Sequence, residues 1–241
     1  MTDAARDSLE RVRDDVIGCF RCPRLVEWRE RTAREKRAAF RDWDYWGRPV
    51  PGFGDPGARL LVVGLAPAAH GGNRTGRVFT GDRSADWLYR AMHRAGFANQ
   101  PTSEHRDDGL RLTGAFVTAV NRCAPPANRP TPQERDNCLP YLEREIALLA
   151  DLQVIVALGA YALDGLARVF SLRPKPKFGH GAEISVAGPD GQAGPMIVCS
   201  FHPSQQNTFT RRLTEEMLDA VFQRARELTN SPREPRRRPP R

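Results

Sequence analysis

Four short apolar runs divide the central part of the chain. They are RLLVVGLA (59–66), GAFVTAV (114–120), QVIVALG (153–159) and PMIVCSF (195–201). The apolar positions in each run are continuous and do not alternate with polar ones, which is typical of parallel strands covered on both faces. The pattern predicts a central, mainly parallel, four-stranded sheet.

Helical patterns lie before and between these runs. Apolar positions repeat at helical spacing in two stretches of residues 6–40. Four further helical stretches cover 84–97, 131–150, 160–170 and 210–229. Ser84 is a candidate N-cap, and Thr131, Pro132 and Glu134 form a capping-box signature. Strands alternating with helices predict an α/β fold, a three-layer α/β/α sandwich, forming one domain over residues 1–230. Residues 41–58, rich in Gly, Pro and aromatic side chains, are expected to form an ordered but irregular loop.

Three unusual loops follow strands directly. They read GLAPAAHGG, NRCAPPANRP and HPSQQN. In an open parallel sheet the ligand site lies at the carboxyl ends of the strands, so these loops are expected to converge on one site.

Charge is unevenly distributed along the chain. The formal net charge is +8, and the last eleven residues, SPREPRRRPPR, hold five arginines and one glutamate. We expect this tail, 231–241, to be disordered, and it is either a solubilising end or a non-specific phosphate tether. No segment has the apolar length of a membrane span or the pattern of a signal peptide, so we expect a cytoplasmic protein without a membrane partner.

Five cysteines suggest a metal centre. Cys19 and Cys22 form a Cys-x-x-Cys pair, and Cys123 and Cys138 form a second pair. In a reducing compartment such thiols are metal ligands more often than disulfides, and zinc and iron–sulfur fit equally well. Buried structural thiols are the alternative. Cys199 lies within an apolar run and is expected in the core.

Several motifs occurring together resemble one family. CFRCPRLVEWRE, VPGFGD, GLAPAAHGGNRTGRVFTGD, RCAPPANRPTPQERDNC and HPSQQNT appear in this order over about residues 15–228. This set is similar to the family five uracil-DNA glycosylases of the uracil-DNA glycosylase superfamily. The resemblance implies excision of uracil and other deaminated bases, such as hypoxanthine and substituted uracils, from double- and single-stranded DNA by a monomeric enzyme. It also implies a 4Fe–4S cluster on the four paired cysteines, against zinc, with no nucleotide cofactor.

Three residues take catalytic or stacking roles under this resemblance. A glycosylase holds a flipped base in a pocket, and Phe79 would stack on that base instead of serving only as a core residue. Asp82 would stabilise positive charge on the sugar or activate water, and it could also cap the following helix. Leu65 and Ala66 cannot do acid–base chemistry, so this role would pass to Asp82. His202 would donate to the departing uracil, although a structural histidine is the simpler interpretation.

Other positions are candidates for binding the substrate. Asn128 could contact the base or its sugar-phosphate, or could stabilise a turn between prolines. Ala69 and its small neighbours would leave room for the nucleotide, and His70 is a further candidate or orders the loop. Arg74, with Arg77 and the SQQNT segment, could contact phosphates.

The expected base-reading asparagine of the related family four enzymes is missing. Its position is Ala119, and Asn121 is not assigned that role. The substitution predicts a pocket of broad specificity. Two other functions compete with a glycosylase: a non-catalytic module for damaged or single-stranded nucleic acid with a structural metal centre, and an iron–sulfur redox protein, which fits poorly with the polar loops.

Overall fold

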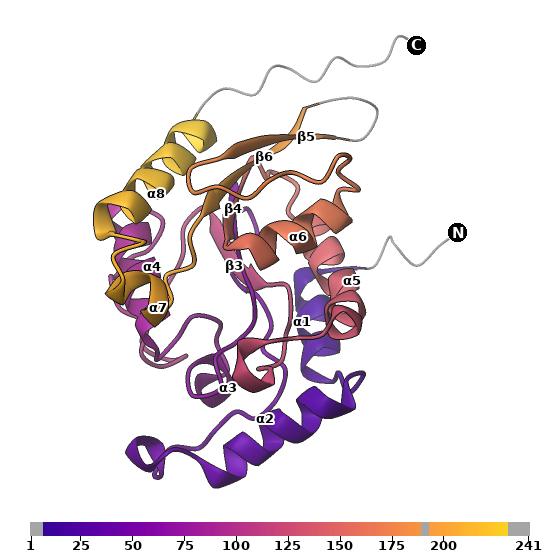
Figure 1. The fold of residues 1–241 in the computed structure, drawn as a ribbon, viewed down its shortest axis with the longest axis vertical. Coiled ribbons are helices and arrows are strands. Elements are labelled where there is room, and N and C mark those ends of the chain that lie inside the picture. The colour runs from indigo at the N-terminus through magenta and orange to yellow at the C-terminus, as the bar shows by residue number, and fades with distance from the viewer. Residues whose placement is uncertain (1–6, 189–192, 231–241) are drawn as a thin grey trace.

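The computed structural model describes residues 7–188 and 193–230 and contains a central six-stranded sheet (Figure 1). Its strand order is β1-β3-β2-β4-β6-β5. The four inner strands are parallel and match the four predicted runs; they are β2 (Leu60–Gly64), β3 (Ala115–Ala119), β4 (Val154–Leu158) and β6 (Ala193–Ser200). The predicted parallel sheet is confirmed.

The predicted strand number of four was wrong, because two edge strands extend the sheet. β1 (Phe53–Gly54) pairs antiparallel with β3, and β5 (Glu183–Ala187) pairs antiparallel with β6. β1 has only two residues, inside the loop expected to be irregular. In β5 only Val186 is buried, so this strand has no apolar run by which to recognise it.

Ten helical elements are described around the sheet. They are α1 (Leu9–Ile17), α2 (Pro23–Glu35), η2 (Ala38–Phe40), α3 (Gly72–Thr75), α4 (Arg83–Arg94), η3 (Pro126–Asn128), α5 (Pro132–Leu148), α6 (Ala160–Val169), α7 (Gln205–Phe209) and α8 (Glu215–Asn230). Among the described helices, none combines the length and hydrophobicity needed to cross a membrane. The tail predicted at 231–241 lies outside the described residues.

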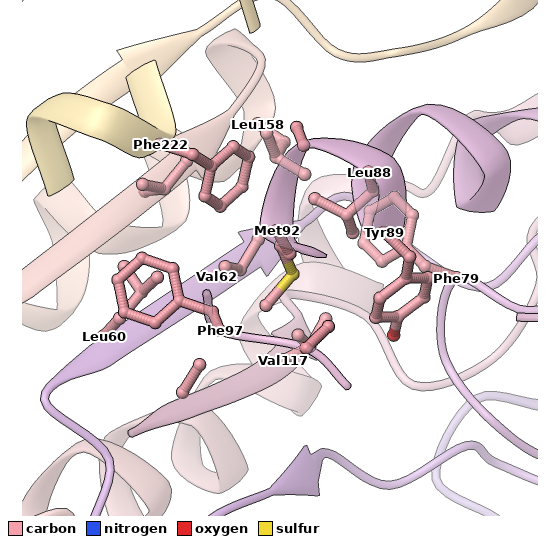
Figure 2. Close-up of a cluster of buried hydrophobic side chains, with 14 of the residues drawn as sticks. Leu60, Val62, Phe79, Leu88, Tyr89, Met92, Phe97, Val117, Leu158 and Phe222 are labelled. Atoms are coloured by element: carbon pink, nitrogen blue, oxygen red, sulfur yellow. The ribbon is translucent and has the colours of Figure 1, made fainter. Parts of the chain in front are cut away.

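Successive strand residues point into two different cores, which explains the continuous apolar runs. Leu60 and Val62 of β2 pack into one cluster with residues of α4 and α8 (Figure 2). Leu61 and Val63 pack into a second cluster on the other face, with residues of α5 and α6. Cys199 of β6 is completely buried in the second cluster, as expected. The predicted three-layer α/β/α sandwich is therefore confirmed.

Local signals determined most helix starts. Thr131 and Glu134 form the predicted capping box, with Pro132 in the first turn of α5. The predicted cap Ser84 was wrong, because α4 begins earlier and Asp82 is its N-cap. The two helical stretches expected within 6–40 are α1 and α2, and Gly18 ends the first while Pro23 starts the second.

Candidate active site

The glycine-rich segment 65–82 leaves the carboxyl end of β2 and leads into α4. It makes one helical turn, α3, and then turns back at Gly76, whose φ of 77° is in the left-handed region. The indole of Trp46 packs so closely here that a Cβ on Gly76 would lie 2.9 Å from a ring carbon. The segment is therefore tightly packed and held in one conformation, as a binding site requires.

Asp82 is held at the end of this segment as the N-cap of α4. Its backbone is extended, and its Oδ1 accepts a hydrogen bond from the Ala85 N–H at 3.0 Å. Burial raises the pKa of Asp82 to about 6, although hydrogen bonds from the backbone of Ala85 and Ser84 favour the ionised form. A carboxylate with a pKa near the working pH is suited to charge stabilisation and proton transfer. The capping role is thus confirmed, and it leaves the second oxygen available for chemistry.

Gly71 lies directly against that second oxygen. An ideal Cβ built on Gly71 would lie 2.1 Å from Asp82 Oδ2, closer than any real contact. Sequence reasoning did not single out Gly71, because its role depends on a neighbour eleven residues away. The only signal was the density of glycines before the carboxylate.

Phe79 lies at the edge of the core, over the end of β2. Its side chain is 7% exposed and packs into the cluster with Leu88 and Tyr89 (Figure 2). A Cβ on Gly64 would lie 2.6 Å from the Phe79 ring, so this glycine makes room for it. The φ of Phe79 is 48°, an uncommon value for a bulky residue and one that marks functional positions.

His202 follows β6 and reaches the same edge of the sheet as Phe79. The two ring centroids lie 5.7 Å apart with an interplanar angle of 30°. Burial lowers the pKa of His202 to about 4, so its imidazole is neutral near pH 7. A neutral imidazole can donate one hydrogen bond to an oxygen that becomes anionic. The structure thus brings Phe79 and His202 together, as expected for loops that follow parallel strands.

Arg74 is buried inside the glycine-rich segment. It is 3% exposed, and its guanidinium donates to the carbonyl oxygens of His70 (2.7 Å) and Gly81 (2.8 Å). The rings of Phe40 and Trp43 each lie 4.0 Å from its guanidinium carbon. This placement favours an ordering role, closing the loop just before Asp82, over the phosphate contact expected from the sequence.

Arg77 is also bonded internally. It is 5% exposed and donates to Ser103 and to Asp108, the latter at 2.7 Å. Its Nη1 also bonds the Arg106 carbonyl oxygen at 3.0 Å. Arg77 therefore anchors the 103–108 loop beneath the glycine-rich segment.

The remaining binding candidates lie around this centre. His70 Nδ1 lies 3.1 Å from the Tyr45 hydroxyl, which favours the loop-ordering interpretation. The Ala69 carbonyl accepts from Asn73 within the same loop. Asn128 is exposed in the loop after β3 and has a φ of 55°, as in a turn. Its contact with the substrate stays a prediction.

The four paired cysteines share one neighbourhood. Burial raises the pKa of Cys123 to about 12, and the thiols of Cys138 and Cys19 are near enough to add to this effect. The thiol of Cys22 similarly acts on Cys138, whose pKa burial raises to about 11. As placed here, no three His, Cys, Asp or Glu side chains in the described ranges could hold a single metal ion.

Hydrogen-bond donors point at the sulfur atoms of these thiols. Arg29 Nη1 donates to Cys123 Sγ at 3.1 Å, and Asn137 Nδ2 donates to Cys22 Sγ at 3.3 Å. Arg29 is only 1% exposed, its Nε is buried without a hydrogen bond, and the carboxylate of Glu30 is 4.0 Å away. A buried cation requires a nearby anion, and thiolate ligands would supply it. The buried Arg29 and the two hydrogen bonds to sulfur therefore fit an anionic group bound through these thiols.

Comparison with known proteins shows the family of this chain. Residues 51–226 match the family model of the uracil DNA glycosylase superfamily. Type-5 uracil-DNA glycosylase of Mycobacterium tuberculosis is 54% identical over 87% of this chain and 78% of its own length. The type-5 enzyme of Thermus thermophilus is 51% identical over 88% of this chain and 94% of its own, and that of Mycobacterium leprae is 48% identical over 95% and 99%. With identities this high over most of both chains, the protein belongs to the type-5 group of the uracil DNA glycosylase superfamily.

Proposed function

We propose that this protein is a DNA repair glycosylase that excises uracil from DNA and leaves an abasic site. The observation that carries the proposal is the partly buried carboxylate of Asp82, which caps α4 at the end of the loop that also positions Phe79. The type-5 relatives are named for the same activity.

The reaction breaks the N-glycosidic bond, and the bonding electron pair leaves with uracil. Positive charge then develops on the sugar, and ionised Asp82 stabilises it or orients the water that adds to the anomeric carbon. Neutral His202 donates a hydrogen bond to the uracil oxygen as negative charge grows there. The proton that the water loses is balanced by the proton that the uracil anion gains, so the products are neutral uracil and an abasic site.

The direct test uses duplex and single-stranded oligonucleotides with one uracil and no added cofactor. We expect abasic product from both, detected as strand cleavage after alkali. Salt-sensitive binding without abasic product would instead support the non-catalytic binding module. We also propose that the enzyme acts as a monomer in the cytoplasm.

The rate of excision should depend on pH through Asp82. Because burial raises its pKa to about 6, the active ionised form is lost as the pH falls through that value. We expect single-turnover rates at saturating enzyme to fall about tenfold for each pH unit well below 6. His202, with a pKa of about 4, stays mainly neutral from pH 8 down to pH 5. A rate that stays constant from about pH 8 to pH 5 would contradict the assignment to Asp82.

Broad base specificity is proposed from the end of β3. Ala119 offers no polar group, and the Asn121 amide is occupied by the Glu134 carbonyl (3.0 Å) and the Tyr161 hydroxyl (2.7 Å). Fewer hydrogen bonds to the edge of the base reduce discrimination between bases. We expect excision of hypoxanthine and 5-substituted uracils in a panel of damaged bases.

A 4Fe–4S cluster held by Cys19, Cys22, Cys123 and Cys138 is proposed as the cofactor. When bound, such a cluster supplies a covalent link between segments far apart in sequence and a negative charge beside Arg29. Arg29 and Asn137 would orient and balance the sulfur ligands through the hydrogen bonds described above. Iron and sulfide analysis with visible absorbance tests this, and one equivalent of zinc without iron would contradict it.

A further inference from the structure

A pocket lies beside the glycine-rich segment, and neither Phe79 nor His202 lines it. Its volume is about 340 Å³, within the range of small-molecule sites, and its walls come from three parts of the chain. Trp43, Tyr45, Trp46 and Arg48 come from the segment after η2, Arg74 from α3, and Arg106 from the loop before β3. We call it the aromatic pocket.

Aromatic rings and guanidinium groups are paired in this pocket. The guanidinium carbons of Arg106 and Arg48 lie 5.2 and 5.7 Å from the centroid of the Trp46 ring. The His105 ring lies 5.7 Å from that of Trp43. Indole faces beside exposed arginines are the combination that binds unpaired bases by stacking and their phosphates by charge.

Nearby acidic groups do not cancel the positive charge of the arginines that line the pocket. Asp44 lines the pocket, and Asp107 lies 3.6 Å from Arg106, but the Asp107 side chain is 71% exposed. Such an exposed ion pair is weak, so an incoming phosphate could replace the carboxylate. Arg48 and the buried Arg74 add two further positive charges.

The aromatic pocket is attached to the glycine-rich segment. The backbone N–H groups of Trp46 and Gly47 donate to the carbonyls of Arg74 and Asn73, at 2.9 and 3.0 Å. The guanidinium of Arg74 separates the pocket from Gly81, the residue before Asp82. In Figure 1, the segment after α2 runs past α3, on the same end of the molecule as the loops at the strand ends. A DNA strand with its uracil at Asp82 therefore has neighbouring nucleotides within reach of the pocket.

We propose that the aromatic pocket binds one unpaired nucleotide of the substrate strand, close to the excised uracil. Its base stacks on the indole lining, and its phosphate contacts Arg48 and Arg106. This rests on the proposed function, since it assumes that uracil-containing DNA is bound at Asp82. In single-stranded DNA the bases next to the uracil are already unpaired. One of these nucleotides could therefore bind the aromatic pocket and hold the strand in place.

The test combines altered DNA with altered protein. Single-stranded oligonucleotides carry one uracil, and one flanking nucleotide at a time is replaced by a tetrahydrofuran abasic analogue. With the wild-type protein, we expect kcat/KM to fall on the order of five- to tenfold at one flanking position or two adjacent ones. The same scan is then made with the Arg48→Gln/Arg106→Gln variant, in which both changes are at exposed positions.

In that variant we expect lower kcat/KM for the intact oligonucleotide and no further loss at the sensitive position, because the nucleotide is no longer held. The matched control is Arg13→Gln/Arg168→Gln, which removes equal charge from α1 and α6, on the other side of the view in Figure 1. The control should keep the wild-type profile.

Three results would overturn the inference while leaving the proposed function intact. One is excision with no sensitive flanking position. Another is an unchanged position-dependent loss in the double variant. The third is a uniform loss in both variants, which would indicate non-specific charge alone. A wild-type protein that excises no uracil would instead contradict the proposed function.

Discussion

Asp82→Asn is expected to reduce uracil excision on the order of 10²- to 10⁴-fold, the range typical of a lost general acid–base or charge-stabilising group. Asparagine is nearly isosteric and caps helices as well as aspartate does, so Ala85 keeps its hydrogen-bond partner. The measurement is the single-turnover rate on uracil-containing duplex. Asp86→Asn, which removes an exposed carboxylate from the same helix, is the matched control and should keep full activity.

The same variant should be more stable than the wild type at neutral pH. Burial raises the pKa of folded Asp82 from 3.8 to about 6, so the folded state binds this proton more tightly than the unfolded chain. The resulting stability is fully present below pH 3.8 and is lost as the pH rises through 6. Above pH 6 the ionised carboxylate costs about 1–3 kcal/mol, and Asn removes that cost.

Thermal unfolding near pH 8 and pH 4 tests whether the substitution stabilises the protein at the higher pH. The melting temperature of Asp82→Asn should exceed that of the wild type at the higher pH, and the difference should shrink at the lower. An active, normally folded Asp82→Asn protein would refute the catalytic assignment. A variant that is inactive and also unstable at both pH values would show instead that Asp82 is needed mainly for folding.

Most of the fold could be predicted because its signals are local. The runs of β2, β3, β4 and β6 are apolar throughout, since alternate residues enter two cores. The capping box of α5 involves residues only three apart. β1 and β5 were not predicted, because an edge strand is held by backbone hydrogen bonds to its neighbour. Such pairing does not require a recognisable pattern of apolar side chains.

Residues of the candidate site that belong to sequence motifs could be proposed from the sequence. Features of the site that depend on packing between distant segments could not. Asp82, Phe79 and His202 were proposed from their motifs, and the structure places the rings of Phe79 and His202 side by side. The burial of Arg74 could not be predicted from the sequence, because it depends on packing against Phe40 and Trp43 from a distant segment. An arginine in a DNA-binding loop is expected to face phosphate, and only the tertiary structure shows that the Arg74 Nε and Nη2 donate to backbone carbonyl oxygens instead.

Gly71→Ala is expected to reduce excision on the order of 10- to 10³-fold without changing any group that does chemistry. The new methyl group would lie 2.1 Å from Asp82 Oδ2, so the carboxylate must move, and displacement of about 1 Å can cost 10²-fold. Gly72→Ala is the matched control, because its methyl group would lie 3.0 Å from the Pro67 Cβ and further from other atoms, requiring only a small adjustment. Rates for both variants on uracil-containing duplex, with melting temperatures, separate displacement of Asp82 from general loss of folding. Equal rates for the two variants would show that Asp82 Oδ2 does not need the position that Gly71 leaves open.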